Sequence, residues 1–291
     1  MTNLTLRWQS RLVLLIVLPA VAADLVLQAH WWYLADREVA LWTLALSAVL
    51  GLVAFLLRAA TRAAAFTGFT LCAALMFATA PLPFSPWRTA LVPVAVLLAL
   101  TSLATRFGRR RKVALGTAEK NTGRNAAQVA ANLGIAALVT NPLAQAYLYS
   151  LRSMPPALVL APGLAALAEA AADTLSSELG QILSNQPRML TTLRVAPAGT
   201  DGAISPGGTL AGTLAAAIVA ATGAFALAGG YPLFLLSLAG AIFGLFFDSL
   251  LGATLERRGW LNNDGVNFLS SLSAAAFALA AATLWPHAGL N

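Results

Sequence analysis

The stretch "RLVLLIVLPAVAADLVLQA", residues 11–29, carries one acidic residue, Asp24, in an otherwise almost wholly apolar run. A helix needs about 20 predominantly apolar residues to cross the hydrocarbon core of a bilayer. The stretch therefore predicts a membrane-spanning helix. Arg7 and Arg11 before the run, and the small residues 20–22 inside it, would also fit a secretory signal peptide. We prefer the spanning helix, because the apolar run continues past Asp24 to Ala29.

The rest of the chain repeats this pattern. Of its 291 residues, 59% are apolar and 10% are charged, whereas about a quarter of the residues in a soluble domain are charged. The sequence thus predicts an all-α, polytopic integral membrane protein with about nine transmembrane helices. Span length and hydropathy place these helices near 11–29, 41–57, 63–80, 88–105, 125–150, 155–178, 209–228, 232–251 and 265–285.

The positions of lysine and arginine predict the orientation. Short cytoplasmic loops carry an excess of these residues. With the N-terminus in the cytoplasm, 15 of the 18 basic residues fall on the cytoplasmic side, and only Arg37, Arg88 and Arg152 fall outside. We therefore expect the N-terminus in the cytoplasm and the protein in a cell inner membrane. The net charge of +7 belongs to these short loops, so we expect no nucleic-acid partner.

The polar residues divide the chain into two regions. Residues 1–113 form an N-terminal apolar region of four helices, and residues 114–291 hold nearly all polar groups inside the predicted spans. The single cysteine, Cys72, excludes a disulfide framework and a thiolate metal site. The two histidines lie at segment ends, and no Ser-His-Asp set or HExxH motif is present. We find no internal repeat, which weakens a reading as an inverted-repeat transporter.

The first polar group lies in "GRNAAQVAANLG" (123–134). Arg124, Gln128 and Asn132 are spaced i, i+4 and i+8, which places them on one stripe of a helix, and Asn125 borders the stripe. Such residues can simply hydrogen-bond neighbouring helices, a contact worth about 0.6 kcal/mol. We favour a functional stripe with Arg124 as an anion contact, because one amide would suffice for packing.

The second group is "ADTLSSELG" (172–180). Asp173 and Glu178 are five residues apart, about 140° round an unbroken helix. They can serve one site only if the helix ends or bends between them, and Gly180 could end it. Otherwise Glu178 is a solvated residue at an ordinary helix terminus. Glu169 lies four residues before Asp173 and shares its face.

The third group is the loop "PRMLTTLRVAPAGTDGAISPGGTLAG" (187–212), which is rich in glycine and precedes a helix. Open backbone N–H groups and a helix N-terminus favour phosphate. No GxxxxGK[ST] motif is present, and taken alone the segment would be an ordinary connector. Its candidate substrate contacts are Arg188, Arg194, Gly199, Thr200, Asp201 and Gly202.

The fourth group lies in "GLFFDSLLGATLERRG" (244–259) and the segment after it. Asp248, Gly252 and Glu256 are spaced i, i+4 and i+8 near the end of an apolar helix. Asp248 could instead be a buried partner for an arginine. Asn267 follows in "VNFLSS" (266–271), and Asp264 is placed to cap the last helix or to serve the site.

The predicted topology puts all four groups on the cytoplasmic side, as a site for a water-soluble ligand requires. Carboxylates and arginines without histidine or cysteine suit Mg²⁺ and phosphate rather than zinc or thiolate chemistry. An ion-coupled transporter or lipid flippase could use the same carboxylates. It would need polar groups that continue toward the outer face, where Asp24 is the main candidate. A scaffold without a site would leave many polar groups in the membrane uncompensated.

Five motifs, in this order, resemble the membrane family DUF92: "GRNAAQVAANLG", "ADTLSSELG", "PAGTDGAISPGGTLAG", "FFDSLLGATLERRG" and "VNFLSS". That family includes the plant phytyl-phosphate kinase of tocopherol synthesis and animal transmembrane protein 19. It is more distantly similar to the CTP-dependent dolichol and phytol kinases. The resemblance covers roughly 115–275. It implies phosphoryl transfer from a nucleoside triphosphate, with CTP favoured, to a prenyl monophosphate such as phytyl or geranylgeranyl phosphate.

The resemblance places family motif positions on Arg124, Asn132, Asp173, Glu178, Gly199, Asp201, Gly202, Asp248, Gly252 and Asn267. The hypothesis is a membrane isoprenyl-phosphate kinase that works with Mg²⁺ among membrane lipids. Asp173, Glu178 and Asp248 are the candidate metal ligands, and Asp173, Asp248 and Arg124 are the candidate catalytic residues. The candidate substrate contacts are Asn125, Gln128, Asn132, Arg188, Arg194, Gly199, Thr200, Asp201, Gly202 and Asn267.

Overall fold

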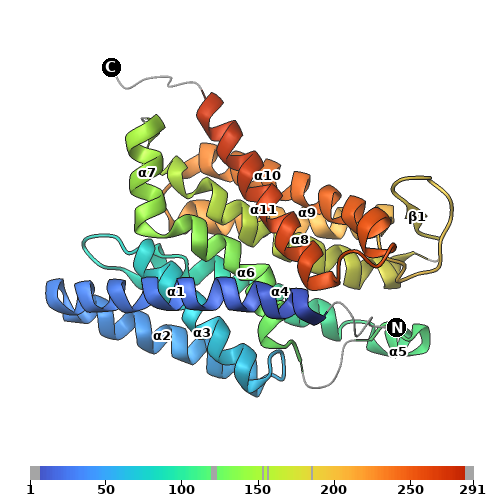
Figure 1. Cartoon of the computed structure of the whole chain (residues 1–291), viewed down its shortest axis with the longest axis horizontal. Helices are drawn as coiled ribbons and strands as arrows, with labels where there is room; N and C mark the ends of the chain where they lie inside the picture. The colour runs from blue at the N-terminus through green and yellow to red at the C-terminus, as the bar shows by residue number, and fades with distance from the viewer. Residues whose placement is uncertain (1–6, 119–122, 153, 156, 185, 286–291) are drawn as a thin grey trace.

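The protein is described from a computed structural model, which covers residues 7–118, 123–152, 154–155, 157–184 and 186–285. It is an all-α membrane protein with one small hairpin (Figure 1). The α-helices are α1 (Arg7–Ala35), α2 (Arg37–Leu56), α3 (Arg62–Ala78), α4 (Leu91–Arg106), α5 (Arg109–Leu115), α6 (Ala126–Thr140), α7 (Pro142–Arg152), α8 (Ala161–Leu183), α9 (Pro206–Ala226), α10 (Gly230–Leu251) and α11 (Asn263–Leu284). The short elements are η2 (Pro86–Arg88), η3 (Leu158–Leu160), η4 (Gly252–Glu256), β1 (Arg188–Met189) and β2 (Ala203–Ile204).

The apolar helices are long enough to cross a membrane several times. In the described part of the chain, six helices pass on length and hydropathy: α1, α2, α8, α9, α10 and α11. Two bent pairs, α4 with α5 at 62° and α6 with α7 at 49°, raise this number to as many as eight, and α3 is a shorter apolar helix. The predicted class, an all-α polytopic membrane protein, is confirmed. The count of nine crossings and the orientation stay predictions.

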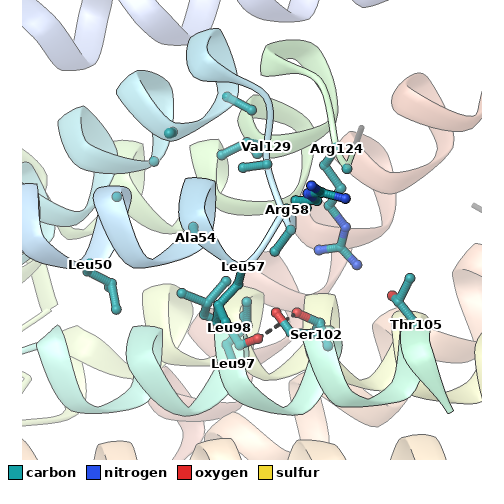
Figure 2. A pocket seen from close by; sticks show the side chains of 18 of the residues that line it. Leu50, Ala54, Leu57, Arg58, Leu97, Leu98, Ser102, Thr105, Arg124 and Val129 are labelled. Atoms are coloured by element: carbon teal, nitrogen blue, oxygen red, sulfur yellow. Dashed lines mark hydrogen bonds between the residues drawn. The ribbon is translucent and has the colours of Figure 1, made fainter. Parts of the chain in front are cut away.

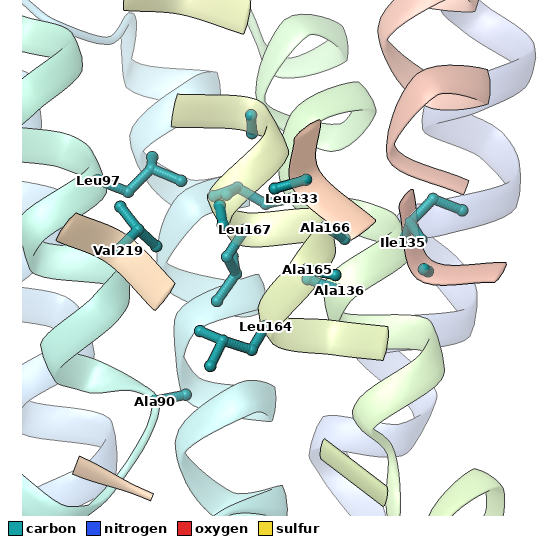
Figure 3. Close-up of a cluster of buried hydrophobic side chains, with 14 of the residues drawn as sticks. Ala90, Leu97, Leu133, Ile135, Ala136, Leu164, Ala165, Ala166, Leu167 and Val219 are labelled. Atoms are coloured by element: carbon teal, nitrogen blue, oxygen red, sulfur yellow. The ribbon is translucent and has the colours of Figure 1, made fainter. Parts of the chain in front are cut away.

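Helix α8 lies at the centre of the bundle. Every residue from Ala161 to Ala172 is buried, and α8 contacts α4, α6, α9, α10 and α11. Figure 3 shows Leu164 and Leu167 of α8 on the side of the helix that faces Leu97 of α4 and Val219 of α9. One hydrophobic core joins residues from α1 through α11, so helices from both predicted regions of the chain build it.

Small residues bring the helices around α8 close together. A Cβ atom on Gly212 of α9 would lie 2.7 Å from the carbonyl oxygen of Ala172, and one on Gly240 of α10 would lie 2.6 Å from that of Ala274. Glycine and alanine at such contacts let helix backbones approach, which drives helix association where lipid is as apolar as leucine. The alanine-rich sequence of α8 therefore explains its central place.

Three predicted helix boundaries can be compared with the structure. The long fifth span breaks before Pro142, as the residue predicts, since proline cannot continue the hydrogen-bond ladder. The helix neither ends nor bends between Asp173 and Glu178, and Gly180 does not end it, because α8 continues to Leu183 without interruption. The prediction that the two carboxylates need such a bend to share a site is wrong, since both line one cavity. Asn262, not Asp264, caps α11, and its side chain accepts a hydrogen bond from the backbone N–H of Gly265.

The polar segments gather at one end of the bundle. Helix α1 begins at this end, and α5 and the β1–β2 hairpin lie there as well, on the right of Figure 1. Helix α11 ends at the opposite end. The sequence predicted that its four polar groups would share one side, and the fold brings the segments that carry them together.

Candidate functional site

A polar cavity of about 390 Å³ opens at this end of the bundle. The start of α6, the second half of α8, the loop between α8 and α9, the end of α10 and the start of α11 all contribute to its wall. The predicted site residues in the wall are Arg124, Gln128, Asn132, Asp173, Glu178, Gly199, Thr200, Asp201, Gly202, Asp248 and Asn267.

Three predicted contacts do not line the cavity. Asn125 is exposed and caps α6 in a reciprocal pair of hydrogen bonds with Gln128, of 2.8 and 3.0 Å. Arg188 is exposed on β1, and its Nη1 donates to the carbonyl oxygen of Leu193 at 2.9 Å. Arg194 is exposed in the turn that follows. Asn125 thus has a structural role at the helix start, and both arginines lie outside the cavity wall.

Two amides from distant segments meet in the wall. Asn267 Nδ2 of α11 donates to Asn132 Oδ1 of α6 at 2.9 Å. Each residue was predicted from its own motif, and the contact joins the two motifs directly. The pair fixes the orientation of both amides and leaves the Asn132 Nδ2 donor for a further partner.

The backbone around Arg124 is pinned to the connection between α2 and α3. The N–H of Arg124 donates to Ala59 at 3.0 Å, and its carbonyl accepts from the N–H of Thr61 at 2.9 Å. Gly123 has φ +75°, and a Cβ there would lie 2.6 Å from the Arg58 carbonyl oxygen. The glycine permits this close approach. The guanidinium then reaches α8, where Nη2 donates to Thr174 Oγ1 at 3.1 Å.

Acidic side chains from α8 and α10 line the cavity. Asp173 lies near Arg124, and no side-chain hydrogen bond to its carboxylate forms within the described residues. Asp248 Oδ2 is buried and has no hydrogen-bond partner in the same part of the chain. Glu169, one turn deeper on α8, is 1% exposed and accepts a 2.6 Å hydrogen bond from Ser271 Oγ. Asp173 and Asp248 thus keep carboxylate oxygens that a ligand could use.

Glu178 has a partner that the sequence did not suggest. Its Oε2 forms a salt bridge with Lys112 Nζ of α5. Lys112 is fully buried and also donates to the carbonyl oxygens of Ala104 at 2.7 Å and Thr105 at 3.1 Å. Glu178 still borders the cavity, but this ion pair occupies one of its two oxygens. Its first role is to hold α5 against α8.

We expect Lys112→Met to lower the free energy of unfolding by up to about 3–5 kcal/mol, because it removes a buried cation and leaves the Glu178 carboxylate, 15% exposed, without its partner. Thermal unfolding of the purified protein in detergent measures the effect. Arg110→Met changes an exposed residue of the same helix and is the matched control. The double variant Lys112→Met/Glu178→Gln should recover part of the loss. Equal melting temperatures for Lys112→Met and Arg110→Met would contradict a structural role of the ion pair.

The glycine-rich loop is tightly folded against α10. β1 pairs antiparallel with β2, and Gly199 and Gly202 between them have φ +83° and +73°. A Cβ on Gly202 would lie 2.1 Å from the backbone nitrogen of Ala253 in the π-helical turn η4, so only glycine fits. Partial burial raises the pKa of Asp201, and the nearby Arg257 guanidinium offsets part of this rise. The loop thus presents backbone groups to the cavity in a fixed conformation.

A second cavity, of about 250 Å³, adjoins the first between α2, α3, α4 and α6. Its wall is mostly hydrocarbon. Figure 2 shows Leu57, Leu97 and Leu98 facing it, with Arg58 and Arg124 at one end. Arg124 and Asn132 line both cavities. A polar compartment and an apolar compartment therefore share a wall that carries a cation and an amide.

The sequence also missed several polar residues of the first cavity. Thr117, Gln181, Ser205, Ser249 and Asn263 are too common in loops and helix ends to be singled out, and they are visible only in the fold. Glu256 was noted in the i, i+4, i+8 series with Asp248 and Gly252 but was not chosen as a site residue, and it too lines the cavity. Across the described residues, no three His, Cys, Asp or Glu side chains are grouped as a ready-made metal site.

A family model for "Integral membrane protein DUF92" matches residues 45–275. The chain belongs to the DUF92 family. Over 202 residues it is 34% identical to an uncharacterized membrane protein of Synechocystis, covering 66% of this chain and 73% of that one. Over 109 residues it is 44% identical to an uncharacterized membrane protein of Methanocaldococcus jannaschii, covering 38% of this chain and 45% of that one.

A plant relative is "Protein VTE6, chloroplastic" of Arabidopsis thaliana, with 29% identity over 181 residues. That alignment covers 61% of this chain and 54% of the plant protein. The chain therefore spans about half the length of this relative and less than half that of the Methanocaldococcus protein. No solved structure matches it. Every residue that lines the two cavities of this DUF92 protein falls inside the matched range.

Proposed function

We propose that this protein is a membrane isoprenyl-phosphate kinase, which transfers the terminal phosphoryl group of a nucleoside triphosphate to a prenyl monophosphate. The observation that carries the proposal is the wall shared by the two cavities, where Arg124 and Asn132 face both. A water-soluble donor fits the polar side, and the hydrocarbon part of a lipid acceptor fits the apolar side. The resemblance to the family of the plant phytyl-phosphate kinase supports the same reaction.

This reaction mainly requires that the two substrates are positioned in line and that the negative charge on the phosphates is neutralised. An oxygen of the lipid phosphate attacks the terminal phosphorus of the nucleotide, the bond from that phosphorus to the bridging oxygen breaks, and a nucleoside diphosphate leaves. A phosphate monoester is already an anionic nucleophile, so no general base is needed. Arg124 lies where it would bind the oxygens between donor and acceptor. The backbone N–H groups of Gly199, Asp201 and Gly202 would bind the nucleotide phosphates, whereas that of Thr200 already donates to the carbonyl oxygen of Pro197 at 3.2 Å.

The carboxylate oxygens of Asp173 and Asp248 are the proposed ligands for a Mg²⁺ ion. Mg²⁺ is commonly held by one or two carboxylates together with substrate phosphates, which suits a site without a group of three acidic ligands among the described residues. The buried, unpaired Asp248 Oδ2 fits such a role. When bound there, Mg²⁺ would neutralise charge on the phosphates. Glu178, the third predicted ligand, would contribute at most the oxygen that Lys112 does not take.

The finer parts of the proposal follow from the sequence. The distribution of basic residues supports nine crossings of a cell inner membrane, with the N-terminus and the polar cavity facing the cytoplasm. CTP is the favoured donor, because the resemblance extends to CTP-dependent lipid kinases. The proposed partners are thus a nucleoside triphosphate, a prenyl monophosphate and membrane lipids.

A transfer assay tests the function. Purified protein in detergent or lipid nanodiscs is mixed with Mg²⁺, a labelled nucleoside triphosphate and a prenyl monophosphate, across CTP, ATP, GTP and UTP and across geranyl, farnesyl, geranylgeranyl and phytyl phosphate. We expect labelled prenyl diphosphate in at least one combination and none when Mg²⁺ is chelated. Absence of the diphosphate in every combination would overturn the proposal.

A further inference from the structure

The apolar cavity has the shape and charge distribution of a site for a lipid with one hydrocarbon chain. It follows α4 from Val94 to Thr105, which is about 16 Å at the helical rise per residue. Most of its wall is leucine, valine, alanine and glycine. Arg58, Arg106 and Arg124 lie toward one end of the wall. An apolar space with cations at one end is complementary to a hydrocarbon chain with an anionic head.

The cationic end has a defined structure. Arg58 follows α2 in a left-handed conformation, with φ +54°, and Arg106 Nη2 donates to the carbonyl oxygen of Leu57. Both arginines are exposed, whereas Arg124 reaches inward to Thr174. Ser102 Oγ, also in the wall, is buried and has no hydrogen-bond partner in the described chain. A polar atom of a ligand would satisfy that hydroxyl group.

Two glycines in the wall of the apolar cavity, Gly51 and Gly68, differ in the space beside them. A Cβ on Gly51 would lie 2.9 Å from the carbonyl oxygen of Ala65, so Gly51 is needed for the contact between α2 and α3. A Cβ on Gly68 would meet only Val129 Cγ1, at 3.9 Å, an ordinary contact. A side chain at position 68 can therefore extend into the cavity without moving a backbone. The space beside Gly68 is open because no side chain fills it.

We propose that this cavity holds the hydrocarbon tail of the acceptor lipid, with its phosphate toward Arg124, and that Gly68 and Val129 limit the tail that fits. The proposal rests on the proposed kinase for the identity of the acceptor. Beyond the kinase reaction, the proposal names the residues that select the acceptor. The tail would contact α2, α3, α4 and α6, away from the carboxylates. A longer side chain at position 68 shortens the tail that the protein accepts.

The first test compares acceptor length in three proteins: wild type, Gly68→Leu and Ala63→Leu. Ala63 is an exposed residue of the same helix outside the cavity wall, so its variant adds a similar side chain outside the site. We expect Gly68→Leu to lower kcat/KM for geranylgeranyl and phytyl phosphate by about 10- to 200-fold, the effect of misfit methylene groups in a pocket. Values for dimethylallyl phosphate and KM for the nucleotide should stay unchanged. Leucine favours a helix over glycine, so α3 should remain folded.

The second test does not depend on turnover. A farnesyl monophosphate with a photoreactive tail is crosslinked to wild-type protein, and the labelled residues are mapped by mass spectrometry. We expect labels on residues 50–57 and 97–105, displaced by farnesyl phosphate but not by farnesol or dipalmitoyl phosphatidic acid, and weaker in Arg124→Gln. Labels elsewhere, or equal displacement by phosphatidic acid, would overturn the tail site.

The two tests separate the tail site from the kinase. Labelling in the cavity without diphosphate formation would contradict the kinase and support the lipid site. Diphosphate formation with the same length preference in wild type and Gly68→Leu would support the kinase and overturn the role of Gly68. An equal loss for all acceptor lengths in Gly68→Leu would also overturn it, because a tail limit must act on long chains first.

Discussion

Asp173→Asn should lower kcat/KM for prenyl-diphosphate formation by on the order of 100-fold or more, the size of effect seen when one electrostatic contact to a transition state is removed. The substitution keeps the volume of the side chain and removes its charge beside Arg124, within the wall of the polar cavity. Labelled product formation at saturating and subsaturating nucleotide measures both kcat and KM.

Asp248→Asn should have an effect of similar size, because Asp248 brings a second carboxylate with an unpaired oxygen, Oδ2, to the cavity. Asp24→Asn is the matched control. Asp24 accepts a hydrogen bond from Gln28 Nε2 within α1 and lines neither cavity, so its variant should keep wild-type activity. A loss in Asp24→Asn equal to that in Asp173→Asn would show that the effect of Asp173→Asn is not specific to the polar cavity, and would contradict the proposed role of Asp173.

Arg124→Gln should raise KM for both substrates and lower kcat, for a combined loss of on the order of 100- to 1000-fold. Arg124 is the cation in the wall shared by the two cavities, so its loss affects donor and acceptor together. Arg124→Lys keeps the charge but lacks the forked donors of a guanidinium. Its activity should fall between that of the wild type and that of Arg124→Gln. Steady-state kinetics with each substrate varied in turn measures the effect.

Arg188→Gln is the control for charge alone. The sequence predicted Arg188 as a phosphate contact, yet it lies on β1 outside the cavity wall, bonded to Leu193. We expect its variant to lose much less activity than Arg124→Gln. An Arg124→Gln protein with wild-type kinetics would contradict the shared-wall site, and a loss in Arg188→Gln as large as in Arg124→Gln would place the phosphates at the hairpin instead.

Much of the fold could be predicted from the sequence, because span length and hydropathy depend on local composition. Helices lie at all nine predicted places, and Pro142 marks the break between α6 and α7. The end of α8 could not be predicted. Gly180 would allow a helix to stop, but it lies against Ser205 and Gly208 of α9. Tertiary packing thus continues the helix past a residue whose local preference is to end it.

The candidate site was predictable where a residue type is costly in a membrane. Asp173, Asp248, Asn132 and Asn267 are conspicuous in apolar helices, and all four line one cavity. The partner of Glu178 could not be predicted, because Lys112 lies 66 residues away in a basic run that resembles any cytoplasmic loop. The apolar cavity was equally hidden. Its leucines and glycines have the composition of every other span, and only packing shows that they leave space.

The central place of α8 has a consequence for how the protein adapts to its ligands. Its alanine-rich first half is enclosed on every side, and closely packed interiors deform little. Asp173 directly follows this enclosed stretch, whereas the outer face of α2 is largely exposed. We therefore expect proposed lipid acceptors of different width to displace the exposed periphery, such as α2, and to leave the position of Asp173 unchanged.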